Sequence, residues 1–152
     1  MRSSLLLLPV IALALGCSQT VEKTVVYPVS GKVVYGGKAA AGVQVFLAPT
    51  ADLMPQDAPS NPHGSTGADG TFTITTYEPG DGAPSGPYQI LLIWPDNKQE
   101  EENDIDKLYG WYDGRYSKLT TIVKEESNII PTLELPVRNG PPPPIQGIPG
   151  KN

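Results

Sequence analysis

An all-β fold of two antiparallel sheets, packed as a sandwich between a disordered signal and a disordered tail, is predicted by this 152-residue sequence. Seventeen prolines and sixteen glycines disfavour long helices and favour short strands joined by turns. Residues 71–75 alternate threonine with Phe72 and Ile74, the period-two pattern of a strand with one buried face. Because that face must be covered, we expect a second layer and about seven strands.

Each expected strand is a short β-branched or aromatic run that ends at a turn signal. Asp69-Gly70 precedes the alternating segment and is typical of a tight hairpin turn. Residues 88–94 are apolar on both faces, which predicts a central strand covered on both sides. Pro131 lacks an N–H group, so it fits a strand only at an edge or a bulge. The other expected strands are 27–35, 43–47, 71–77, 119–124 and 129–135, with a long loop at 50–63.

The sequence divides into four parts around this sandwich. We expect a signal peptide at 1–16, a tether at 17–26, the β-sandwich at 27–137 and a proline-rich tail at 138–152. Pro141 to Pro144 favour the polyproline II conformation, and the tail is too poor in apolar residues to fold. We therefore expect a stiff, disordered end, with a docking segment for a proline-binding groove as the alternative.

The first residues have the composition of a secretory signal. Arg2 precedes eleven apolar residues from Leu5 to Leu15, whereas a membrane-spanning helix needs about 20. Residues 13–17 (LALGC) then resemble the lipobox of bacterial lipoprotein signal peptides. The resemblance implies cleavage before Cys17, a diacylglycerol group on its sulfur and a fatty acyl chain such as palmitate on its new amino group. Such chains would anchor the protein in a membrane.

Cys17 is the only cysteine, so no intramolecular disulfide can form. The alternative to lipidation is an ordinary cleaved signal followed by an incidental cysteine. Ser18 stands where an aspartate accompanies retention in the inner membrane, so the outer membrane is favoured if the cell has two. We expect a protein of the cell envelope that faces the periplasm or the exterior.

Composition also bears on the partners and the chemistry of the chain. The net charge is −5 and the basic residues are scattered, so nucleic acid is not an expected partner. His63 is the only histidine, and no motif of a nucleophile elbow or a zinc protease is present. We therefore expect no catalysis and no cofactor, with His63 as a solvated loop residue.

An aromatic loop at residues 108–116 is the candidate site for a ligand or a partner. Its composition suits stacking against a sugar ring or contact with a protein surface. The alternative is that Trp111 and Tyr116 close one end of the sandwich. The candidate contact residues are Tyr109, Trp111, Tyr112, Arg115 and Tyr116.

An acidic run at residues 100–106 precedes this loop. Asp104 and Asp106 are weak candidates for calcium, because carboxylate oxygens are the ligands that calcium prefers. The run lacks the glycine and the glutamate at the positions of an EF-hand, so a solvated acidic loop is the simpler interpretation, and no metal site is predicted.

Three segments resemble the carboxypeptidase regulatory-like domains. They are residues 29–38 (VSGKVVYGGK), 41–47 (AGVQVFL) and 66–74 (TGADGTFTI), and residues 85–90 (SGPYQI) resemble a later strand of that family. The resemblance covers about Tyr27 to Leu135, includes small secreted bacterial lipoproteins, and implies a seven-stranded, transthyretin-like sandwich. Members act as accessory, adhesive or carrier modules, and the shared residues are structural, so the resemblance bears on fold more than on function.

Together these patterns predict a lipid-anchored module with a structural or binding role at the cell envelope. Its partners would be the membrane, through the anchor, and an unidentified envelope protein or glycan. The alternative is a carbohydrate-binding or calcium-dependent adhesion module that works through residues 108–116.

Overall fold

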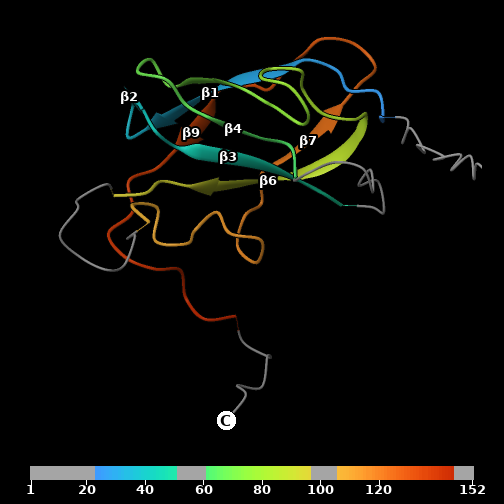
Figure 1. Ribbon diagram of the computed structural model, residues 1–152. Helices are drawn as coiled ribbons and strands as arrows, with labels where there is room; N and C mark the ends of the chain where they lie inside the picture. Colours follow the sequence, from blue (N-terminus) through green and yellow to red (C-terminus); the bar gives the residue numbers. More distant parts are fainter. Residues whose placement is uncertain (1–22, 51–60, 97–105, 146–152) are drawn as a thin grey trace, which may run out of the picture.

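The computed structural model describes residues 23–50, 61–96 and 106–145, which form two packed β-sheets (Figure 1). One sheet has the order β2-β1-β5, with β8 and β9 also paired to β1, and the other has the order β4-β3-β6-β7. The predicted all-β sandwich is therefore confirmed. Its strands are β1 (Val29–Tyr35), β2 (Lys38–Ala39), β3 (Gln44–Pro49), β4 (His63–Ser65), β5 (Thr71–Thr73), β6 (Gly86–Ile93), β7 (Thr120–Val123), β8 (Asn128–Ile129) and β9 (Leu133–Leu135).

One sheet is mixed, where the sequence predicted only antiparallel pairing. Strand β1 is antiparallel to β5 but parallel to β8 and β9. The chain crosses from β7 to the opposite sheet after residue 123 and runs beside β1 in the same direction. The expected strand 129–135 is split into β8 and β9 at Pro131, as a residue without an N–H group requires.

The predicted turn at Asp69-Gly70 lies within a hairpin whose two arms belong to different sheets. Strand β4 pairs with β3 and strand β5 pairs with β1. The arms are joined by two hydrogen bonds between His63 and Thr75, with N–O distances of 3.0 and 2.7 Å. His63 was expected in a loop but lies in β4, where its ring is exposed and stacks on Phe46.

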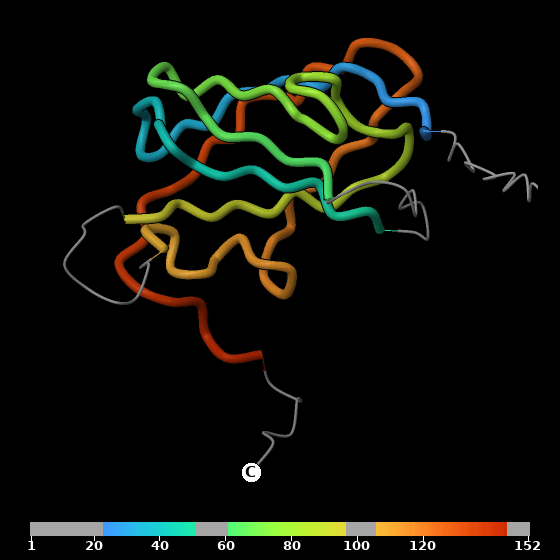
Figure 2. Tube along the Cα trace, in the orientation of Figure 1, coloured from blue at the N-terminus to red at the C-terminus, as the bar shows by residue number. Residues whose placement is uncertain are grey.

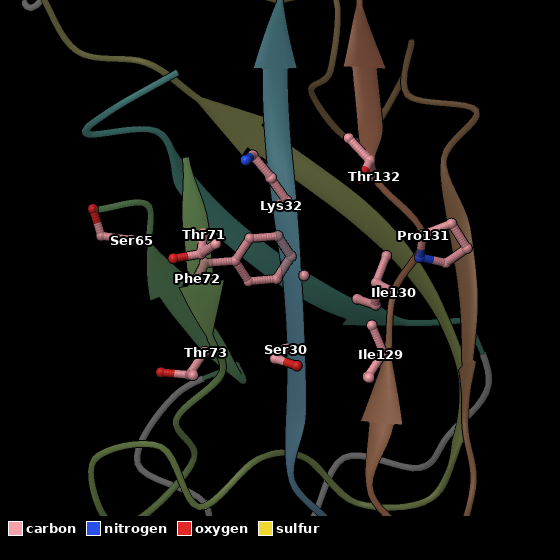
Figure 3. A pocket seen from close by; sticks show the side chains of 11 residues that line it. Ser30, Lys32, Ser65, Thr71, Phe72, Thr73, Ile129, Ile130, Pro131 and Thr132 are labelled. Carbon is pink, nitrogen blue, oxygen red and sulfur yellow. The ribbon is translucent and has the colours of Figure 1, made fainter. Parts of the chain in front are cut away.

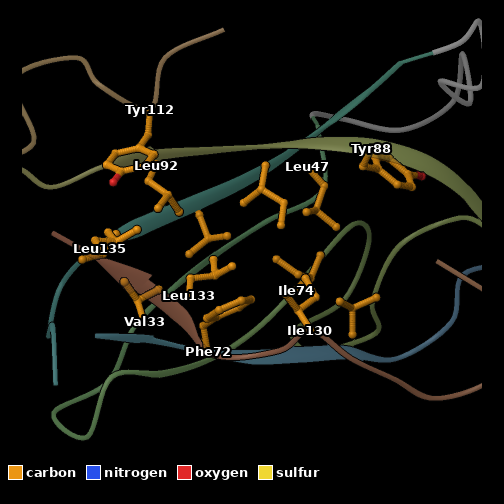
Figure 4. Close-up of a cluster of buried hydrophobic side chains, with 14 of the residues drawn as sticks. Val33, Leu47, Phe72, Ile74, Tyr88, Leu92, Tyr112, Ile130, Leu133 and Leu135 are labelled. Atoms are coloured by element: carbon orange, nitrogen blue, oxygen red, sulfur yellow. The ribbon is translucent and has the colours of Figure 1, made fainter. Parts of the chain in front are cut away.

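The apolar side chains of both sheets meet in one core, and the two residues that predicted it are inside it. Phe72 is 3% exposed and Ile74 is fully buried. The buried side chains fill the space between β3 and β6 on one side and β1 and β9 on the other (Figure 4). Tyr88 lies at one end of this cluster and Tyr112 at the other, beside Leu92 and Leu135.

Residues just before the predicted domain also contact it. In the expected tether, Lys23 forms an ion pair with Glu78 and the N–H of Thr24 bonds to the Tyr77 hydroxyl. The start of the described chain, in blue, lies at one end of the sandwich, and residues 106–112, in amber, lie at the other (Figure 2). Within the described ranges no helix is long and apolar enough to cross a membrane.

Candidate partner-binding site

The aromatic segment, residues 106–117, runs along strand β6. The N–H of Leu92 donates to the carbonyl of Tyr112 at 3.1 Å, and the N–H of Ile90 donates to that of Leu119 at 2.9 Å. The side-chain amide of Gln89 adds a hydrogen bond of 2.9 Å to the carbonyl of Ser117. These bonds fasten a segment without regular structure to the central strand of the sheet, so its side chains have defined places.

Asp106 holds the start of the aromatic segment to the end of β6. One carboxylate oxygen accepts the backbone N–H groups of Trp94 at 2.8 Å and Leu108 at 3.0 Å. The other accepts the N–H of Gly110 at 2.9 Å. A carboxylate that accepts several backbone N–H groups stabilises a turn, so this weak calcium candidate has a structural role. Asp104, Cys17 and most of the acidic run lie outside the described residues.

A second carboxylate, Asp113, shapes the far end of the segment. Its Oδ1 accepts the N–H groups of Arg115 at 2.8 Å and Tyr116 at 3.1 Å, and its Oδ2 lies 3.3 Å from the Arg115 guanidinium. Partial burial is the largest single influence on the pKa of Asp113 and would raise it, but these hydrogen bonds and the charge of Arg115 together lower it. The carboxylate therefore stays ionised and holds the turn at neutral pH.

The five candidate contact residues have different surroundings. Tyr112 is 8% exposed and packs into the core, so it is not available to a partner. Tyr109 and Arg115 face solvent, and Tyr109 has a positive φ of 53°, which is uncommon for a residue with a side chain. Trp111 and Tyr116 are half-buried. Leu108 and Tyr112 are buried in the core, and the half-buried Trp111 packs against it.

Trp111 is covered by the beginning of the proline-rich tail. The guanidinium carbon of Arg138 lies 3.8 Å from the centre of the Trp111 ring, a cation–π contact. The indole N–H of Trp111 donates to the carbonyl of Gly140 at 2.7 Å. Arg138 and Gly140 therefore make defined contacts with the sandwich, although we expected a disordered end.

A further contact fixes the tail at Arg138. The N–H of Arg138 donates to the hydroxyl of Tyr35 at 2.9 Å, and the Tyr35 ring packs edge-on against Trp94. The Nε of Arg138 is buried and has no hydrogen-bond partner within the described ranges. The sequence did not predict Arg138 and Tyr35 as parts of this site. They are 103 positions apart in the chain, and no local sequence pattern links residues at that distance.

The tail and the aromatic segment enclose a hollow of about 360 Å³. Its lining is mainly apolar and includes two prolines of the tail. The lining residues are Trp111, Tyr112, Tyr116, Lys118, Leu119, Arg138, Pro142 and Pro143. This is the place where the structure brings the predicted aromatic residues and the predicted polyproline run together.

Two larger hollows lie on the outer faces of the sheets. One, of about 660 Å³, lies over β1 and β5 beside the break between β8 and β9 (Figure 3). The other, of about 630 Å³, lies over Phe46 and His63. Within the described ranges no group of three or more histidine, cysteine, aspartate or glutamate residues is placed to hold a metal ion.

The fold of this chain is similar to that of a protein of known structure. No family model matches this chain, and no curated protein matches it. The chain is similar to a DUF3823 family protein from Parabacteroides merdae ATCC 43184, with 19% identity and a TM-score of 0.40. The match covers 74% of this chain and 46% of the other, so this chain spans less than half the length of that protein.

Proposed function

We propose that this protein is a lipid-anchored, extracytoplasmic β-sandwich that binds a partner at the cell envelope and has no catalysis of its own. Cys17 carries the lipid, and the signal peptide is removed before it. The lipobox-like residues 13–17 and the apolar run before them support this assignment. The resemblance of about Tyr27 to Leu135 to carboxypeptidase regulatory-like domains, whose members act as accessory, adhesive or carrier modules, is consistent with this role but bears mainly on the fold.

The position of the aromatic segment is the observation that carries the proposal. Residues 23–27 and residues 106–112 lie at opposite ends of the sandwich (Figure 2). Lys23 lies six positions after Cys17, and a chain of six residues spans at most about 20 Å. An anchor at Cys17 therefore holds the end with Lys23 close to the bilayer and presents the aromatic segment away from it.

The alternative of a glycan-binding module is less well supported by the geometry. Stacking on a sugar requires an open aromatic face, but Arg138 lies over one face of Trp111 and Tyr112 is buried. The calcium-dependent form of this alternative is weakened further, because both carboxylate oxygens of Asp106 accept backbone N–H groups. A protein segment fits the exposed Tyr109 and Arg115 better.

Intact mass spectrometry of the protein from bacterial membranes tests the anchor. We expect the mature chain to begin at Cys17 and to carry the added mass of a diacylglycerol group and an acyl chain. Cys17→Ser should lose that mass and leave the membrane fraction, whereas the neighbouring change Ser18→Ala should keep both. A wild-type chain with an unmodified Cys17, or with a different first residue, would refute the anchor.

A further inference from the structure

We infer that the surface around Trp111 is a recognition site for a proline-rich segment of another protein, and that this chain's own tail occupies it in the free state. The bound segment is in the polyproline II conformation and presents a backbone carbonyl to the indole of Trp111. This inference specifies the partner of the proposed binding role and does not depend on the lipid anchor.

The contact between Trp111 and the tail has the chemistry of polyproline recognition. A polyproline II segment makes no internal hydrogen bonds, so its carbonyl groups are free to accept from a protein. Here the indole N–H donates to the carbonyl of Gly140, the residue directly before the four prolines. Aromatic rings that contact proline side chains complete such sites in other proteins.

Aromatic and apolar side chains line the continuation of this surface. Trp111, Tyr116 and Leu119 face the hollow that Pro142 and Pro143 cover. The backbone that carries these rings is held in place independently of the tail, because the aromatic segment is hydrogen-bonded to β6. A preformed surface of this kind loses little entropy on binding.

The tail is held loosely enough to be displaced. Pro142 is half-buried, while Pro141, Pro143 and Pro144 are exposed. A hollow of about 360 Å³ remains between the tail and the aromatic segment. The tail therefore acts as a tethered ligand that fills the site only in part. Its effective concentration of about millimolar lets it compete with partners in solution for this site.

The indole signals in the nuclear magnetic resonance spectrum of the full chain give a direct test. The protein has two tryptophans, so Trp94 serves as an internal reference for Trp111. In the full chain with Pro142→Ser and Pro143→Ser, we expect the Trp111 N–H signal to move and its hydrogen exchange to accelerate at least tenfold. The matched change of two exposed prolines, Pro141→Ser with Pro144→Ser, should have a smaller effect.

A synthetic peptide with the sequence of residues 139–145 (NGPPPPI) then tests recognition between molecules. Added to the Pro142→Ser, Pro143→Ser protein, it should bind saturably and return the Trp111 signal towards its wild-type position. Binding to the wild-type chain should be at least tenfold weaker, because the tail competes. A peptide with serine in place of all four prolines should not bind.

Three results of these experiments would overturn the inference, and so would a fourth, from the oligomeric state. The first three are a Trp111 signal that both pairs of proline changes leave in place, a failure of the peptide to bind the opened protein, and equal binding of the serine peptide. Concentration-dependent association of the wild-type chain through exchanged tails would also count against it, since the partner would then be a second copy. None of these results bears on the mass of Cys17, so the two proposals fail separately.

Discussion

At the scale of single residues, glycine is required where two backbone segments pack closely against each other. Gly70 has a φ of +79°, and a Cβ atom there would lie 2.4 Å from the carbonyl oxygen of Val33. Gly37 has nearly the same φ, +77°, but no atom lies within 4 Å of its added Cβ. An alanine at Gly37 would therefore cause only the strain of a left-handed backbone, whereas an alanine at Gly70 would also clash with a neighbouring strand.

We expect Gly70→Ala to lower the free energy of unfolding by more than about 3 kcal/mol and Gly37→Ala to lower it by about 1–2 kcal/mol. Both variants have the strain of a positive φ, but only the first must also move strand β1. Urea denaturation of the two variants and the wild type measures the difference. Equal losses would show that the close approach to Val33 does not matter.

Asp106 is the residue on which the start of the aromatic segment depends. Asp106→Ala leaves the N–H groups of Trp94, Leu108 and Gly110 without their acceptor. Hydrogen bonds to charged groups contribute about 1.5–3 kcal/mol each in favourable cases, so we expect a loss of about 2–4 kcal/mol in unfolding free energy. The exposed Glu125→Ala is a suitable control and should change it by less than about 0.5 kcal/mol.

At the scale of an element, the turn between β5 and β6 depends on a carboxylate. Asp81 accepts the backbone N–H groups of Thr76, Tyr77 and Glu78 at 2.7 to 2.9 Å. Burial is the largest single influence on the pKa of Asp81 and would raise it, but the three N–H groups together lower it below the ordinary value of 3.8. The unfolded state therefore binds the proton more tightly than the folded state does.

This difference in the pKa of Asp81 makes the stability of the protein depend on pH. The contribution of the carboxylate is fully present above the unfolded-state pKa of 3.8 and is lost as the pH falls through the lower folded-state value. In Asp81→Asn we expect a smaller loss of unfolding free energy between pH 5 and pH 2 than in the wild type. The slope of stability against pH, from urea denaturation, is the measurement, and an unchanged slope would exclude Asp81 as a contributor.

At the scale of the whole molecule, the tail that follows β9 packs against the aromatic segment. Arg138 is followed by Asn139, so trypsin can cleave between them only when the tail is released. Trp111→Phe keeps an aromatic ring under Arg138 but removes the N–H that bonds to Gly140. When the tail separates from Trp111, the peptide bond between Arg138 and Asn139 becomes accessible to trypsin, although the sandwich stays folded.

We therefore expect Trp111→Phe to accelerate tryptic cleavage after Arg138 several-fold, with a change of at most about 1 kcal/mol in unfolding free energy. Mass spectrometry of the released fragments that begin at Asn139 follows the rate. The exposed Tyr109→Phe should leave that rate at its wild-type value. A rate that is the same in all three proteins would show that the hydrogen bond to Gly140 does not hold the tail.

Local patterns were sufficient for the fold class and for most of the strands, but not for the short strands β2 and β4. The alternation at 71–75 placed Phe72 and Ile74 in the core. The apolar run 88–94 corresponds to the interior strand β6, but only one of its faces is buried, so the expected cover on both sides was wrong. Pro131 divided the last expected strand as its missing N–H group requires. These features are encoded within a few residues, because side-chain period and turn chemistry act at that range.

The site was predictable only in part. Composition selected the aromatic loop, but it did not separate the buried Tyr112 from the exposed Tyr109, because burial depends on which residues from other strands lie nearby. The tail that meets Trp111 comes from residues about 30 positions further along the chain. No local pattern joins two such segments.

For this protein, period and turn chemistry were enough to establish an all-β sandwich of short strands. The tertiary structure decided the parallel pairing of β1 with β8 and β9, the separation of the arms of the 63–75 hairpin between two sheets, and the meeting of Trp111 with the tail. The physical reason is range: a strand is formed by neighbours in the chain, whereas the pairing of strands and the covering of a ring depend on how distant segments share the same core.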